Sequence, residues 1–173
     1  MKIYIPFYIL LFIIGCAPSP QLYNTIPIIN FQNQIDYRDK TLEIGNVMGG
    51  ELTNELEGSK INAIILKVAL IESFKKYKLF LITNIKADYR LNAIIMYQNQ
   101  PLAGLDMTAN LLVKYSLINQ NSNEEIWTKD INSIYTAKFS DSLIGMERLN
   151  MANEGAIRKN IEILLQTLAV LKL

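Results

Sequence analysis

Apolar side chains recur at helical spacing in a segment that begins after residue 59. They step along the chain by threes and fours, which keeps one face of an α-helix apolar. These positions are Ile61, Ile64, Ile65, Val68 and Ile71. We predict an amphipathic helix over residues 60–77, with Ser59 as its N-cap. Lys75, Lys76 and Lys78 come at its end, where the helix dipole favours positive charge.

A second and longer stripe with the same spacing lies near the end of the sequence. It runs from Leu149 to Leu171 within residues 143–172, and a helix of that length would measure about 45 Å. We expect its N-cap at Ser140, Asp141 or Ser142, because short polar side chains accept hydrogen bonds from the first free amides of a helix.

Three segments between these helices show the two-residue alternation of β-strands. They cover residues 89–97, 107–117 and 125–137, and in each the apolar and polar side chains point to opposite faces. The loops between them predict two hairpins in series. A shorter strand is expected at 41–47, and an edge strand is expected to begin at 26–29, where Pro27 permits only an edge position.

The order of these elements, β-α-β-β-β-α, predicts the α+β class. Strands of about 13 residues would measure about 43 Å, which matches the length of the final helix. We therefore expect an antiparallel sheet of about four long strands, with the two amphipathic helices packed on one face.

The first residues of the sequence combine one positive side chain with a short apolar run. Lys2 precedes an apolar stretch over residues 3–14, which is shorter than the roughly 20 residues of a membrane-spanning helix and fits the central region of a secretory signal. Gly15 and Cys16 end the run, and a Pro/Ser segment follows at 17–20. The alternatives are a plain signal peptide with a chance cysteine, or a short hydrophobic anchor.

Residues 13–16, Ile-Ile-Gly-Cys, resemble the bacterial lipobox. The resemblance implies that Cys16 is acylated and becomes the first residue of the mature chain, held in a membrane. Position 17 is Ala instead of the Asp that retains some lipoproteins at the inner membrane, which favours the outer membrane, facing the periplasm. We therefore expect a signal peptide at 1–15, a lipidated cysteine and tether at 16–40, and one α+β domain at 41–173.

Charge and composition remove several classes of function. The chain has 17 basic and 16 acidic residues, a net charge of +1, whereas a nucleic-acid binder needs a basic face. It has no histidine, which is the commonest general base and metal ligand. Its single cysteine cannot form an intrachain disulfide or a thiolate cluster. We expect no enzymatic activity, no catalytic residue, no cofactor, no metal and no nucleic-acid partner.

Two groups of residues resemble fragments of known catalytic or phosphate-binding motifs. Gly45, Gly49 and Gly50 follow a strand, but the Gly-Lys-Ser order of a phosphate loop is absent, so turn glycines are the favoured interpretation. Ser73 and Lys76 match the bare Ser-x-x-Lys spacing without the companion motifs of that hydrolase class. We interpret this match as chance.

Carboxylates also gather in two short stretches, at Asp36, Asp39, Glu51, Glu55 and Glu57. A divalent-cation loop needs convergent oxygens at defined spacing, and neither stretch has that spacing. We interpret both as solvated loops.

Two further groups leave a binding surface open. The three lysines at the end of the 60–77 helix are candidates for contact with acidic lipid headgroups or with a partner. The favoured interpretation is that they stabilise the end of the helix. An aromatic set provides candidate walls for a lipid or peptide groove, but sheet core and cross-strand pairs are favoured. This set is Tyr89, Tyr97, Tyr115, Trp127 and Tyr135.

With its lipobox and its order of elements, the chain is similar to small periplasmic lipoproteins of a two-layer α+β type. These include the lipopolysaccharide-assembly lipoprotein and the auxiliary lipoproteins of lipid-trafficking ABC transporters. The stretches that carry the likeness include 88–91, 104–106, 113–115, 152–154 and 156–160.

The resemblance implies a non-enzymatic accessory or assembly subunit of an envelope complex, in lipid or lipopolysaccharide transport. Its partners would be the membrane, through Cys16, and an envelope protein. The alternative is a carrier module for a lipid or hydrophobic peptide, and the least favoured hypothesis is an enzyme that uses carboxylates alone.

Overall fold

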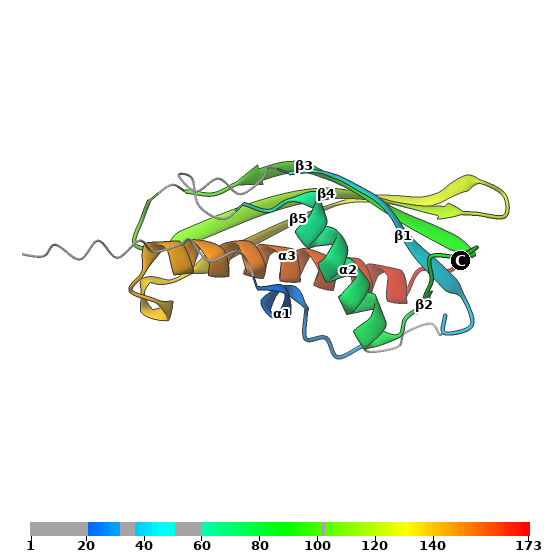
Figure 1. The fold of residues 1–173 in the computed structure, drawn as a ribbon, viewed down its shortest axis with the longest axis horizontal. Coiled ribbons are helices and arrows are strands. Elements are labelled where there is room, and N and C mark those ends of the chain that lie inside the picture. The colour runs from blue at the N-terminus through cyan, green and yellow to red at the C-terminus, as the bar shows by residue number, and fades with distance from the viewer. Residues whose placement is uncertain (1–20, 32–36, 51–59, 102) are drawn as a thin grey trace, which may run out of the picture.

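One mixed sheet of five strands forms the centre of the molecule (Figure 1). The structure is a computed structural model that describes residues 21–31, 37–50, 60–101 and 103–173. The strands are β1 (Thr41–Gly49), β2 (Leu81–Ile82), β3 (Tyr89–Asn99), β4 (Met107–Asn119) and β5 (Glu124–Ala137). They lie in the order β2-β1-β3-β4-β5. The α+β class and the four long strands are confirmed.

The sheet is not antiparallel throughout, and that part of the prediction is wrong. β3, β4 and β5 pair antiparallel as two successive hairpins, but β1 runs parallel to both β2 and β3. The reason is the helix between β1 and β3, which carries the chain back to the end of the sheet where β1 began. β2 has only two residues, too few to show a periodic pattern.

Two long helices lie on one face of the sheet, as predicted (Figure 1). α2 (Ala63–Tyr77) contacts β1, and α3 (Gly145–Ala169) contacts both β4 and β5. A single-turn helix, α1 (Leu22–Thr25), contacts both of them, and a 3-10 turn, η1 (Phe139–Asp141), precedes α3. Within the described ranges, no helix has the length and apolar character needed to cross a membrane.

The helix caps differ from those predicted. Ser59 lies outside the described residues, and Asn62 caps α2 by accepting hydrogen bonds from the amides of Ile64 (3.0 Å) and Ile65 (3.1 Å). Ile144 occupies the N-cap position of α3 and makes no side-chain cap. The three predicted cap residues instead form η1 and the turn after it, where the Ser142 hydroxyl accepts from the Ile144 amide (3.1 Å).

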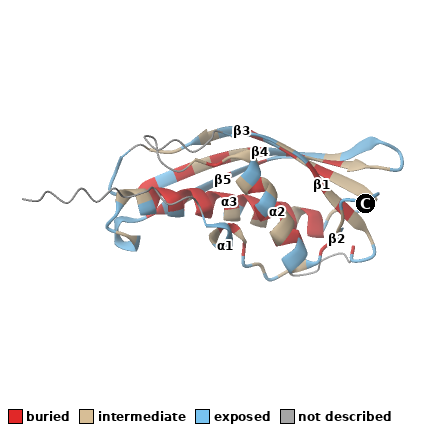
Figure 2. Ribbon diagram, in the orientation of Figure 1, coloured by how far each residue is buried: buried red, intermediate tan, exposed pale blue. Residues whose placement is uncertain are grey.

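The hydrophobic core lies between the helices and the sheet. Alternate residues of β4, from Met107 to Leu117, point toward the helices and are buried, as is the apolar stripe of α3 (Figure 2). These residues belong to one continuous cluster that also includes Phe74 of α2 and Phe80. The alternation seen in the sequence therefore assigns the buried face of β4 correctly.

A buried polar network fixes α3 on the sheet. Tyr115 of β4 donates a hydrogen bond to the Asn160 side-chain oxygen (2.8 Å), and the Asn160 amide group donates to the Ile131 carbonyl (2.9 Å) of β5. The Ser133 hydroxyl donates to the Ala156 carbonyl (2.9 Å). Burial raises the pKa of Tyr115 far above its ordinary value, so this phenol stays protonated as a donor. The network fixes the register of helix and sheet, because these groups are paired only in one alignment.

Candidate functional site

Residues 21–31 form an extended strap that crosses α3 first and α2 second, with α1 at its start. The predicted edge strand at 26–29 is therefore wrong, because Pro27 and Ile29 pair with side chains of α2 instead of with the sheet. Whether residues 16–40 form one tether stays a prediction, but residues 21–31 of that segment pack against the domain.

The buried carboxylate of Glu154 in α3 holds the first turn of the strap. Its two oxygens accept hydrogen bonds from the Gln21 amide (2.5 Å) and from the Asn24 side chain (2.8 Å). One turn further along α3, Arg158 donates to the Asn24 carbonyl (2.8 Å). Charge-assisted bonds of this kind are stronger than neutral ones, so α3 fixes where the strap begins.

The second half of the strap is held by the last turn of α2. The buried Pro27 offers its carbonyl, which accepts from the Lys76 ammonium (2.9 Å) and from the Tyr77 hydroxyl (2.7 Å). The same hydroxyl accepts from the Ile29 amide (2.7 Å). Phe31 packs edge-on against the Tyr77 ring, with centroids 5.3 Å apart. The strap is therefore tied to both helices at fixed points.

An open groove of about 540 Å³ lies between the strap, α2 and α3. Lys76, Arg158 and Glu162 provide its charged walls. Tyr23 and Ile28 line it from the strap, and they are 84% and 89% exposed. Lys76 and Arg158 each donate a hydrogen bond to a carbonyl of the strap. An ammonium has three N–H groups and a guanidinium has five. The groove therefore offers two cations, flanked by two solvated apolar side chains.

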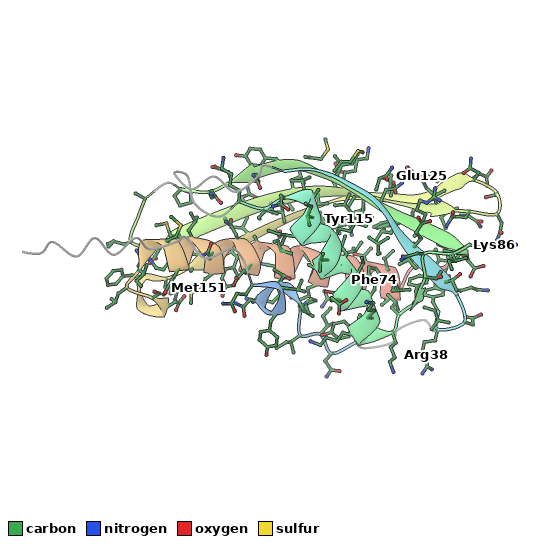
Figure 3. The ribbon with its side chains drawn as sticks, viewed as in Figure 1. Arg38, Phe74, Lys86, Tyr115, Glu125 and Met151 are labelled. Atoms are coloured by element: carbon green, nitrogen blue, oxygen red, sulfur yellow. The ribbon has the colours of Figure 1, made fainter. Side chains whose placement is uncertain are left out.

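A second surface feature lies where α3 begins, at the end of the molecule marked by Met151 in Figure 3. The residues Leu105, Phe139, Leu143 and Ile144 are exposed there, Leu105 to 73% and Leu143 to 81%. We call this set the loop cluster. It comes from the two loops on either side of the β4–β5 hairpin.

The buried Arg148 holds the two loops of the loop cluster together. Its guanidinium donates to the Ser142 carbonyl (2.6 Å) of one loop and the Gly104 carbonyl (3.2 Å) of the other. It also lies 5.1 Å from the centroid of the Phe139 ring. The apolar side chains are therefore presented from loops with fixed positions, which is the arrangement of a preformed contact surface.

Several of the residues singled out in the sequence lie outside the described part of the chain. These are Cys16, Asp36, Glu51, Glu55 and Glu57. Asp39 pairs with Lys40 (3.4 Å). Among the described residues there is no group of three or more His, Cys, Asp or Glu side chains placed to hold a metal.

The motif-like residues in the described ranges have structural positions. Gly49 and Gly50, at the end of β1, have positive φ values of 82° and 75°, a region that favours glycine. Ser73 is buried, whereas Lys76 is exposed and bonded to the strap. This arrangement does not resemble a Ser-Lys pair.

The aromatic set does not wall the 540 Å³ groove. Tyr115 is buried in the core, Tyr97 is exposed, and the other three are partly buried and pack against the core. These three are Tyr89, Trp127 and Tyr135. The favoured interpretation of sheet core therefore holds for four of the five aromatics.

The three lysines at the end of α2 have separate environments. Lys75 pairs with Glu72 (2.9 Å), Lys76 contacts the strap, and Lys78 occupies the left-handed C-cap position. Lys75 and Lys76 lie in the last turn of the helix, where positive charge was predicted to be stabilising.

The residues that organise both surfaces were not identified from the sequence as functional. Arg148, Glu154 and Arg158 lie on α3, and the first two are buried within its apolar face. A charged residue inside an apolar helical stripe was the available signal, since such a group needs a partner when buried. The sequence did not reveal that those partners are the strap and two loops.

Comparison with known proteins shows likeness in fold. No family model matches the sequence, and no curated protein matches it. A Xanthomonas campestris protein of family DUF330 has a TM-score of 0.64 at 11% identity, covering 88% of this chain and 93% of its own. The PelC dodecamer subunit from Paraburkholderia phytofirmans has a TM-score of 0.53 at 12% identity, covering 80% and 96%.

A third solved structure, the hypothetical protein CT253 from Chlamydia trachomatis, has a TM-score of 0.51 at 10% identity. The match covers 75% of this chain and 92% of the Chlamydia protein. At these identities the likeness concerns the fold alone, which recurs in several bacterial proteins with different sequences.

Proposed function

We propose that the protein is a lipid-anchored subunit of a bacterial envelope complex, without enzymatic activity of its own. The acylated Cys16 holds the domain at the periplasmic face of the outer membrane. The complex handles lipids or lipopolysaccharide, as the resemblance of the sequence implies. Support for the anchor comes from the lipobox at 13–16 and from the strap, which begins five positions after Cys16 and is bonded to Glu154.

The loop cluster is the observation that carries the accessory role. Four large apolar side chains are exposed together at one end of the domain, on loops that Arg148 holds in place. Exposed apolar groups that are held rigidly are typical of protein interaction sites. We assign this surface to contact with an envelope protein.

The carrier hypothesis receives less support from the packing. A carrier would need an apolar cavity between helices and sheet, but the core side chains described there are almost completely buried. The 540 Å³ groove lies outside this core and has three charged residues in its lining. An apolar lipid tail would leave those charges without water or a partner.

The first part of the test concerns the anchor. We would purify the protein from membranes and measure the mass of its N-terminal peptide, expecting a cysteine at position 16 that carries the acyl groups. Cys16→Ser alone would not show whether the acyl groups anchor the protein, because blocked processing leaves residues 3–14 in place as an apolar anchor. A wild-type chain that is soluble and carries no lipid would overturn the proposal.

The second part concerns the partner. A photo-crosslinking residue would replace Leu143 in living cells, and Glu125, exposed in the β4–β5 turn region (Figure 3), provides the matched control position. We expect one envelope protein to be crosslinked from position 143 and not from 125. Placing the crosslinker at Leu105 and adding Leu143→Asp should abolish the product. Crosslinking to lipid alone would favour the carrier instead.

A further inference from the structure

The strap fixes which side of the domain is nearest to the membrane; this step rests on the proposed acylation of Cys16. Five peptide units separate Cys16 from Gln21 and span at most about 17 Å. The Gln21 amide is bonded to the buried Glu154 in α3. The start of the strap is therefore held within that distance of the lipid anchor, on the side of the domain formed by α1, the rest of the strap and the end of α2 (Figure 1).

Two apolar side chains project from this same side. Tyr23 and Ile28 are almost fully exposed on the strap, although Pro27 between them is buried. A tyrosine prefers the interface between water and lipid, because its ring is apolar and its hydroxyl is polar. Side chains of this type, next to a lipid anchor, are placed to enter the headgroup region of a bilayer.

The charges around these side chains are mainly positive. Four cations lie around the groove and the end of α2, at Lys75, Lys76, Lys78 and Arg158. Three carboxylates lie on the same side: Glu72, which pairs with Lys75, Glu162 in the groove lining, and the buried Glu154, which holds the strap. The four cations therefore outnumber the carboxylates by one, and by two when the buried Glu154 is left out. Each basic side chain near an anionic membrane contributes about fivefold to binding.

We propose that this side, the anchor face, lies on the bilayer that holds Cys16, and that the groove between Lys76 and Arg158 takes the phosphate of an anionic phospholipid headgroup. The anchor face comprises Tyr23, Ile28 and the four cations. A guanidinium and an ammonium are the usual partners of phosphate in proteins. The groove is open to solvent at the strap, so a headgroup enters from the bilayer without displacing the core. The loop cluster then stays available to a protein partner.

The test uses the full lipidated protein in vesicles of phosphatidylcholine, with and without phosphatidylglycerol. The chain has a single cysteine, and acylation removes its thiol, so new cysteines can be labelled selectively. A fluorophore would be attached at Tyr23→Cys or Ile28→Cys, and at Glu125→Cys as control (Figure 3). Quenching by lipids that carry a nitroxide on the headgroup measures contact with the bilayer. We expect strong quenching at 23 and 28 when phosphatidylglycerol is present, and little at 125.

Charge variants test the role of the cations. Lys76→Gln with Arg158→Gln should lower the ratio of docked to undocked protein by about 25-fold, at about fivefold for each cation. The matched control is Lys86→Gln with Lys114→Gln, which removes the same charge elsewhere; Lys114 lies on the sheet face away from the helices. Because Lys76 also bonds the strap, Lys75→Gln with Lys78→Asn provides a second variant that leaves the described strap contacts intact.

The outcomes separate the two proposals. If labels at 23 and 28 stay as unquenched as the label at 125, while the protein still floats with the vesicles, the anchor face is wrong and the lipid anchor stands. If the protein carries no lipid and does not float, both proposals fail. Equal loss of quenching in the anchor-face variants and in the matched control would also overturn the headgroup site.

Discussion

Gly155 lies in the middle of α3, against the ring of Tyr135 on β5. A Cβ atom built on Gly155 would overlap the ring, with the Tyr135 Cε1 only 2.6 Å away and two other ring carbons closer still. The ring is partly buried and has the Arg158 guanidinium 5.3 Å from its centroid. Gly155 therefore allows helix and strand to approach, and Gly155→Ala makes this packing measurable.

Two opposing effects decide the result of Gly155→Ala. Alanine is favoured over glycine in a helix interior by about 1 kcal/mol, whereas overpacking a close contact is unfavourable by about 1–3 kcal/mol. The net change should be a loss of about 0–2 kcal/mol in the free energy of unfolding. In a Tyr135→Ala background the overlap disappears, and Gly155→Ala should then stabilise by about 1 kcal/mol. The sign of the effect should reverse.

Urea unfolding of the four proteins provides the assay. The single tryptophan, Trp127, is partly buried against the core and reports the transition. The chain from residue 17 onward contains all described residues and suits this measurement. We expect a coupling of about 1–3 kcal/mol between the two sites. Equal effects of Gly155→Ala in both backgrounds would refute the reasoning, since α3 and β5 would then not be in contact at this point.

Three other predictions concern buried or hydrogen-bonded polar groups. Asn160→Leu leaves the buried Tyr115 hydroxyl unpaired and should lower the free energy of unfolding, measured in urea, by about 2–4 kcal/mol. Adding Tyr115→Phe removes that hydroxyl and should restore part of the lost stability. A double variant no more stable than Asn160→Leu alone would contradict the network. Hydrogen bonds from the Thr41 amide (2.8 Å) and hydroxyl (2.7 Å) lower the pKa of Asp88 below its ordinary value of 3.8. The ionised Asp88 therefore stabilises the folded state fully above that ordinary pKa, and this stabilisation is lost as the pH falls through the lower pKa that Asp88 has in the folded protein. Urea midpoints between about pH 5 and about pH 2 should therefore fall less steeply for Asp88→Asn. Glu154→Gln places an amide donor opposite a strap donor, so hydrogen exchange should accelerate at residues 21–25 and not along α3.

The sequence determined the elements whose pattern is repeated over many residues. The alternation along 107–117 gave both the strand β4 and its buried face, and the stripe from Leu149 to Leu171 gave α3 within a few residues at each end. These signals are strong because one face of each element must leave water, which requires the same residue type at every second, third or fourth position. The resemblance to a lipobox is equally local, because residues 13–16 carry it, and it stays a prediction.

Which elements pair and which polar groups meet depends on the path of the chain in three dimensions. The parallel pairing of β1 with β3 depends on the path of α2, and two-residue β2 exists because β1 provides its edge. Glu154 lies 133 positions from Gln21, and Arg148 lies 44 positions from Gly104. Such contacts leave no periodic trace, because each involves one residue on each side. The groove and the loop cluster are built from contacts of this kind. They form only when the strap packs on α2 and α3 and when Arg148 of α3 bonds the two loops.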